Sequence, residues 1–254
     1  MIAEWAVVGL AVATAAAAGL VGCFAVMRRM ALAADALSHV ALPGIGLALA
    51  FHVNPLAGAL LALFAGAVLV WTLEERSGIP VDTIVGVVFS AALAVGSMMT
   101  SGEELIEVLF GHAGGVSTWE LVFGLAAAAL AITFVIRTRH RLVVALVSPD
   151  LARTSGVNLR RLNLGYLLVF ALTVALGLRH LGVLLMGSLI IIPAATARRL
   201  ASNLTQMLAL SVGVAVVTTV AGLVVADRLH REPGPVTVTM AAGIFALTFL
   251  GRRR

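Results

Sequence analysis

Hydrophobic positions dominate this chain in long runs that short polar connections separate. Nine such runs occupy residues 5–27, 35–52, 55–73, 82–100, 118–136, 162–178, 181–197, 205–226 and 235–250. A helix that crosses the hydrocarbon core of a bilayer needs about 20 apolar residues, with a range of about 17–25. The pattern therefore predicts an all-α polytopic membrane protein with about eight or nine transmembrane helices, eight if one short run is re-entrant.

The composition supports this class of protein. Of the 254 residues, 61% are hydrophobic and only 11% are charged, against about 25% charged residues in an ordinary soluble domain. A soluble domain of this size would need far more polar surface. Since no long linker or low-complexity stretch divides the chain, we expect residues 1–254 to form one transmembrane domain.

The positive charges predict the orientation of the chain, because cytoplasmic connections of membrane proteins are enriched in arginine and lysine. With the N-terminus outside, 14 of the 17 arginines fall on the cytoplasmic side. The exceptions are Arg179, Arg228 and Arg231. We therefore expect the C-terminus to lie in the cytoplasm.

All 17 basic side chains are arginine, so the chain contains no lysine. A Walker A phosphate loop requires a lysine at the β- and γ-phosphates of the nucleotide. If ATP drives this protein, another chain must hydrolyse it, and we expect no enzyme activity here. The single cysteine, Cys23, excludes an internal disulfide and a multi-thiolate metal site. We expect no permanently bound cofactor.

Two ionisable residues begin the second apolar run. Asp35 and His39 are four residues apart, which places both on one face of a helix, about 6 Å apart along its axis. Ionisable residues inside a membrane span mark a pathway by default, and this pair suits zinc, manganese or ferrous iron. Two alternatives remain: Asp35 pairs with Arg29 at the membrane interface, and His39 is a hydrogen-bonded packing residue.

Residues near this pair predict a break in the helix and close helix packing. Pro43 cannot donate a hydrogen bond to the carbonyl of His39, and Gly44 allows a neighbouring helix to approach closely. With Ser38, these residues form the candidate pathway and hinge. Pro193, in a later run, predicts either a second hinge or re-entrant break or a tolerated kink.

The longest connection, residues 137–161, contains a helix start of its own. Ser148 is suited to cap a helix and Pro149 to occupy its first position. Gly156 is suited to end that helix. We therefore expect a short helix at about 149–155 on the cytoplasmic surface, without a separate soluble domain.

Four stretches of the chain resemble one family, the zinc- and manganese-type permeases of ABC transporters (ZnuB-, MntB- and TroC-like). They are DALSHVALPGIGLAL from Asp35, DTIVGVVF from Asp82, DLARTSGVN from Asp150 and VLLMGSLIIIPAATA from Val183. The four stretches follow the order and spacing of that family, and the length of the chain also fits.

The resemblance implies a permease related to the cobalamin and siderophore importer type. It implies a homodimer in the plasma membrane, two copies of an ATP-binding subunit on its cytoplasmic side, and a metal-binding protein outside. Asp35 and His39 would be ligands on the pathway of a divalent metal, zinc first and manganese next, during high-affinity import. Residues 148–158 would dock the ATPase through Asp150, Ala152 and Gly156.

Two other classes of function remain as alternatives. A stand-alone secondary transporter or channel would use Asp35 as a proton site and would need no ATPase. An intramembrane metallohydrolase would use Asp35 and His39 as ligands. The H-E-x-x-H pattern of zinc hydrolases is absent from the sequence, and no glutamate lies well inside an apolar run to act as a general base.

Overall fold

The computed structural model describes residues 2–99 and 117–250, except for the side chains of residues 2–4, 31–34, 99 and 179–185. The described residues form helices and no strands. The helices are α1 (Ile2–Met27), α2 (Ala31–His39), α3 (Ala41–Ala50), α4 (Pro55–Ser77), α5 (Val81–Met99), α7 (Thr118–Val147), α8 (Pro149–Thr154), α9 (Leu159–Leu200), α10 (Leu204–Leu229) and α11 (Pro233–Leu250).

Short polar side chains begin several of these helices. The Asn54 side chain accepts a hydrogen bond from the Leu56 amide at 2.9 Å. Ser117 and Glu120 form a reciprocal capping box at the start of α7. Ser148 caps α8 through the Leu151 amide at 3.2 Å, as the sequence predicted. Each cap satisfies an amide that has no partner in the first turn of a helix.

Seven of the nine predicted runs correspond to helices that are long and apolar enough to cross a membrane. The run 35–52 is divided into the shorter helices α2 and α3. The runs 162–178 and 181–197, which the sequence separated, belong to one helical stretch of 42 residues, α9. The prediction of two separate helices here is therefore wrong, because one helix covers both runs.

The path of α9 nevertheless changes direction between those two runs. Any side chain at position 177 would overlap the sulfur of Met186. Residues nine apart are separated by about 13 Å along a straight helix, so this contact requires a sharp bend between Gly177 and Met186. We call the two parts the first limb and the second limb of α9.

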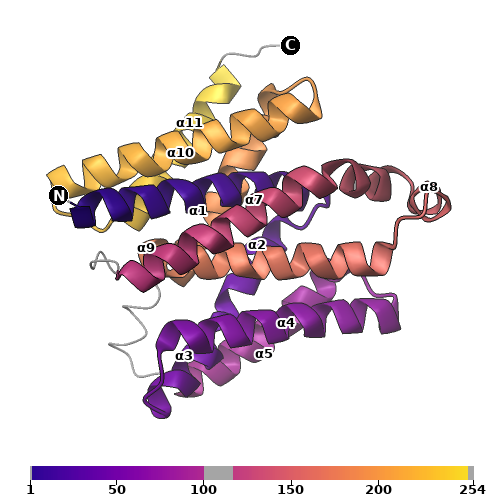
Figure 1. The fold of residues 1–254 in the computed structure, drawn as a ribbon, viewed down its shortest axis with the longest axis horizontal. Helices are drawn as coiled ribbons and strands as arrows, with labels where there is room; N and C mark the ends of the chain where they lie inside the picture. The colour runs from indigo at the N-terminus through magenta and orange to yellow at the C-terminus, as the bar shows by residue number, and fades with distance from the viewer. Residues whose placement is uncertain (1, 100–116, 251–254) are drawn as a thin grey trace.

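The bent helix α9 lies at the centre of the bundle and packs against α1, α2, α4, α7, α10 and α11. Figure 1 shows α1, α10 and the first limb of α9 running lengthwise through the molecule, with α4 and α5 along one side. The short helix α8 lies at the right end of this view, and the α3–α4 connection lies at the left end. The candidate docking segment and that connection are therefore at opposite ends of the bundle.

Candidate functional site

The candidate pathway residues lie where the second apolar run is interrupted. Helix α2 ends at His39 and α3 begins at Ala41, with Val40 between them at φ −63° and ψ −17°. Pro43 has no amide hydrogen to donate to the carbonyl of His39, which explains why the helical hydrogen bonding stops at this point. The break that the sequence predicted at Pro43 is present.

Close packing against α4 holds this interrupted segment in place. A Cβ at Gly44 would overlap the carbonyl of Gly58, and a Cβ at Gly58 would overlap the carbonyl of Gly44. Further along α4, a Cβ at Gly66 would lie 2.6 Å from Cγ1 of Val40. The close approach predicted at Gly44 is therefore present, and α4 supports both sides of the break.

The imidazole of His39 is buried with one nitrogen unpaired. Its relative exposure is 9%, and its ring makes an edge-to-face contact with Phe89, with the ring centroids 5.3 Å apart. Among the described residues, no group forms a hydrogen bond with the buried Nδ1. A packing histidine is expected to have its buried nitrogens paired, because an unpaired one costs about 1–3 kcal/mol. The orphaned Nδ1 therefore fits a ligand atom better than a packing residue.

Asp35 lies one helical turn before His39 and is exposed on the isolated chain. It packs against the second limb of α9, where a Cβ at Gly187 would lie 2.7 Å from the Cα and 2.9 Å from the Oδ1 of Asp35. Within the described ranges, no ion pair joins Asp35 to Arg29, which adopts φ 61°. The interfacial pairing that the sequence left open is therefore not formed.

The remaining candidate hinge residues have separate roles. The hydroxyl of Ser38 donates to the carbonyl of Asp35 at 2.6 Å, so it is engaged within α2. Helix α9 continues through Pro193, so the helix break that was one expectation there is absent and the tolerated proline fits. The bend of α9 lies instead between Gly177 and Met186, across the boundary between the apolar runs 162–178 and 181–197.

The described part of one chain supplies too few ligands for a complete metal site. Over residues 2–99 and 117–250, no group of three or more histidine, cysteine, aspartate or glutamate side chains is close enough to hold a metal ion. A four-coordinate site therefore needs ligands beyond those that the described residues bring together. Phe89 and Gly187, which shape the surroundings of the pair, were not singled out by the sequence pattern.

The candidate docking segment lies at the end of the bundle opposite the α3–α4 connection (Figure 1). Asp150 is exposed and pairs with Arg153 at 3.1 Å, and Gly156 is exposed at φ 78°. Ala152 is fully buried, so it holds α8 to the bundle and is corrected from a surface contact to a packing residue. The adjacent Leu151 is 56% exposed and is the apolar side chain that the segment presents.

A cluster of side chains connects the start of α9, which directly follows this segment, to α4. The guanidinium of Arg160 lies 4.8 Å from the Trp71 ring centroid and pairs with Glu75 at 3.5 Å. The indole of Trp71 donates to the carbonyl of Arg160 at 3.1 Å. Because α4 also contacts α3 at Gly58, this one helix touches both the start of α9, directly after the docking segment, and the interrupted pathway helix.

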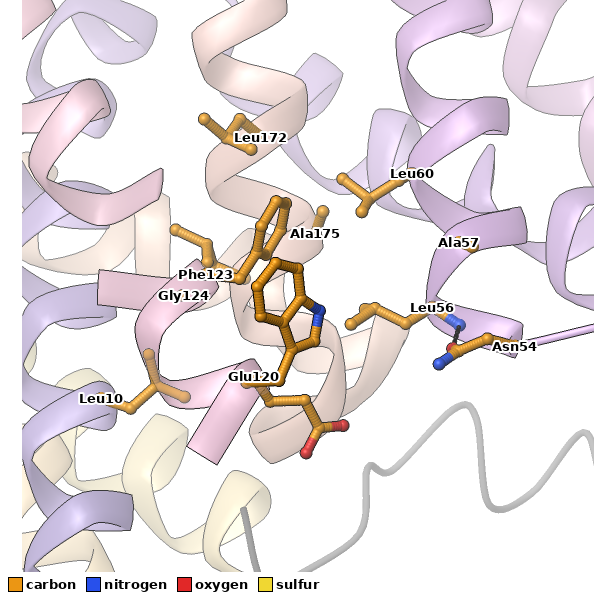
Figure 2. A pocket seen from close by; sticks show the side chains of 12 residues that line it. Leu10, Asn54, Leu56, Ala57, Leu60, Glu120, Phe123, Gly124, Leu172 and Ala175 are labelled. Atoms are coloured by element: carbon orange, nitrogen blue, oxygen red, sulfur yellow. Dashed lines mark hydrogen bonds between the residues drawn. The ribbon is translucent and has the colours of Figure 1, made fainter. Parts of the chain in front are cut away.

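A cavity of about 220 Å³ lies between α1, α4, α7 and α9 (Figure 2). Its walls are mainly leucine, alanine and aromatic side chains, and its polar lining residues are Asn54, Glu120 and Trp119. Asn54 caps α4 and Glu120 belongs to the capping box of α7. Asn54 and Glu120 therefore have structural roles, and the lining as a whole lacks the ligand set of a metal site.

One protein family and several of its relatives match nearly the whole of this chain. The model of the ABC 3 transport family matches residues 2–252. The chain is 31% identical to the high-affinity zinc uptake system membrane protein ZnuB of Haemophilus influenzae, over 92% of this chain and 91% of that protein. It is 30% identical to the manganese transport system membrane protein MntC of Listeria innocua, over 91% and 84%.

A solved structure shows the same arrangement of helices. The chain resembles PsaBC from Streptococcus pneumoniae in complex with Fab, with a TM-score of 0.82 and 26% identity. The match covers 96% of this chain and 89% of that chain. The similarity therefore extends over nearly the whole bundle.

Proposed function

This chain belongs to the ABC 3 transport family, and from that premise we propose that it is the membrane permease of an importer that moves a divalent transition metal into the cytoplasm. Zinc is the first candidate substrate and manganese the second, since relatives with those two names match nearly the whole chain. Membership of an ABC family does not favour the alternative of a stand-alone secondary transporter.

The observation that carries the proposal is the unpaired Nδ1 of His39 one turn from the carboxylate of Asp35. An imidazole nitrogen and a carboxylate oxygen are ligands that zinc and manganese both accept. A two-fold homodimer would bring two copies of each ligand toward one axis. Four such ligands would complete a four-coordinate site for the cation.

Energy would come from a separate ATP-binding subunit in two copies, docked on α8 at the cytoplasmic end, where the C-terminus would also lie. A short helix with the exposed apolar Leu151 and the exposed ion pair Asp150–Arg153 is suited to insert into a groove of such a partner. Outside, a metal-binding protein would deliver the ion. The two permease subunits would alternate between outward-open and inward-open arrangements.

Helix α4 would transmit a movement of the docked ATPase to the pathway residues. The Trp71–Arg160–Glu75 cluster fastens its cytoplasmic end to the start of α9. Its other half is packed against α3 through Gly58 and against Val40 through Gly66. A displacement of the docking segment would therefore move the helix that supports the break beside His39.

Reconstitution tests the proposed function directly. We expect proteoliposomes that contain the permease, its ATPase and its binding protein to take up zinc only with ATP, and manganese more slowly. Uptake is measured for each ion separately by elemental analysis of the vesicles. ATP-independent uptake by the permease alone would contradict the proposal and support a secondary transporter.

A single substitution tests the docking role of α8. Leu151→Asp places a charge on the exposed apolar position, and we expect it to weaken association with the ATPase at least about tenfold, as for an anchor residue worth about 2 kcal/mol. Affinity is measured between the purified subunits. The matched control is Leu229→Asp, since Leu229 is similarly exposed at the end of α10 and should leave the affinity unchanged; equal effects of the two would rule out docking at α8.

A further inference from the structure

The cavity of about 220 Å³ between α1, α4, α7 and α9 has a buried, apolar floor. Its most deeply buried lining residues are Leu10, Leu172 and Ala175, which are 5%, 7% and 3% exposed. Leucine and phenylalanine side chains of α4 and α7 form much of the remaining wall. An apolar cavity of about 150 Å³ already stays dry and accepts a molecule such as benzene. This larger cavity is therefore suited to an apolar occupant rather than to water.

The cavity exists because two of the helices that border it do not pack closely together. Within the described residues, α4 and α7 each pack against α9 but make at most a marginal contact with each other. Helix α7 is held instead against α1, where a Cβ at Gly124 would lie 2.5 Å from Cδ1 of Leu10. Walls that face an empty space lose their dispersion contacts on that side. An occupant that fills the gap between α4 and α7 is therefore favoured.

The cavity begins at the level where a membrane meets water. Trp119 lines it, is the second residue of the membrane-length helix α7 and is 76% exposed. Tryptophan is enriched at the membrane–water interface. Phe123, which also lines the cavity, lies four residues further, about 6 Å along the helix axis. The cavity therefore extends from the level of the lipid headgroups into the hydrocarbon layer, where acyl chains are the surrounding apolar molecules.

The polar lining residues lie together on one side of the cavity. Figure 2 shows the Asn54 side chain and the Glu120 carboxylate on the side away from Leu172. The Glu120 carboxylate accepts a hydrogen bond from the Ser117 amide at 2.9 Å, which fixes the position of its charge. None of the described lining residues is basic. A lone carboxylate at this place repels an anionic headgroup and attracts an ammonium group.

We propose that this cavity binds one acyl chain of a zwitterionic phospholipid, with the ammonium group of its headgroup near Glu120. The acyl chain fills the gap between α4 and α7 and reaches the floor at Leu172. It thereby supports α4 in the half of that helix that packs against α3 through Gly58. Neither Asp35 nor His39 lines the cavity, so the lipid site does not depend on the metal proposal.

A density map of the full-length permease in lipid nanodiscs tests the site by direct observation. The nanodiscs contain equal amounts of phosphatidylethanolamine, which is zwitterionic, and phosphatidylglycerol, which is anionic. We expect elongated density inside the cavity, in contact with Leu60 and Phe123 and continuing past Trp119 to a headgroup. An empty cavity, isolated water peaks, or density that continues into a protein chain would overturn the proposal.

A cavity-filling variant tests the same site by counting lipids. Ala57→Phe places a ring at the exposed rim of the cavity, and we expect it to retain one phospholipid fewer per chain than the wild type. Retained lipids are counted by native mass spectrometry after transfer from the nanodiscs into detergent. The matched control is Ala129→Phe, at an exposed alanine of α7 that does not line the cavity. Equal lipid counts in all three proteins would show that the cavity holds no lipid.

Glu120→Gln tests the choice of headgroup, because glutamine preserves a capping box and removes only the charge. We expect the wild type to retain phosphatidylethanolamine over phosphatidylglycerol by about threefold or more, and Glu120→Gln to lose most of this preference. Glu232→Gln, at an exposed glutamate that does not line the cavity, should keep it. A wild type without preference, or the same preference in Glu120→Gln, would overturn the assignment of a zwitterionic lipid.

Discussion

Replacing both candidate ligands, as Asp35→Asn with His39→Gln, is expected to reduce metal uptake by the reconstituted transporter at least about tenfold. Both substitutions preserve approximate size but remove the anionic carboxylate and the imidazole. Even residues that only orient a metal ligand change affinity about 10- to 100-fold, so the loss of two ligands from each subunit should have a larger effect. Uptake is measured as the initial rate at several zinc concentrations.

The matched control is His52→Asn, because His52 is an exposed histidine beyond the end of α3. Asparagine also tolerates its positive φ of 54°. This variant should transport at the normal rate. Association with the ATPase should be normal in all the variants, which separates a lost pathway from a lost complex. An unchanged uptake rate in the double variant would refute the ligand assignment.

A second large effect is expected from the contact between α3 and α4. Gly58→Val would drive a branched side chain into the Gly44 carbonyl, and a Cβ at Gly58 would already lie 2.6 Å from Cβ of Ala48. Because the obstacle is backbone, the helices must separate, and overpacking of this kind costs about 1–3 kcal/mol or more. We expect a lower Tm of the purified permease, by about 2–4 °C for each kcal/mol, and a lower yield of folded protein.

Gly243→Ala provides the comparison for this variant. No atom lies within 4 Å of a Cβ at Gly243 in the middle of α11, and alanine is favoured over glycine in a helix by about 0.5–1 kcal/mol. The Tm should therefore remain the same or rise slightly. If Gly58→Val and Gly243→Ala gave the same Tm, the close approach of α3 and α4 would be disproved.

The sequence predicted the parts of this fold that depend on local chemistry. Apolar runs give membrane-length helices because only a helix satisfies its own backbone in lipid. Pro43 interrupts a helix because it lacks an amide hydrogen, and Ser148 caps α8 through its side-chain oxygen. These features require only residues that are neighbours in the chain, so the order of the amino acids is enough to predict them.

Features that depend on contacts between residues far apart in the sequence could not be predicted in this way. The sequence separated two apolar runs where α9 bends, but it did not indicate that helical hydrogen bonding runs on through the bend. Gly187 faces Asp35 although about 150 residues separate them. Likewise, the packing of α8 against the bundle decides that Ala152 is buried and Leu151 is exposed.

The claim that Asp35 and His39 bind the transported metal is tested most directly by X-ray absorption spectroscopy of the zinc-loaded transporter. The account predicts zinc–nitrogen or zinc–oxygen distances of about 2.0–2.2 Å and outer-shell scattering from imidazole. That scattering should disappear in the permease with Asp35→Asn and His39→Gln, while His52→Asn should retain it. An identical spectrum from the wild type and the double variant, at equal zinc content, would contradict the account.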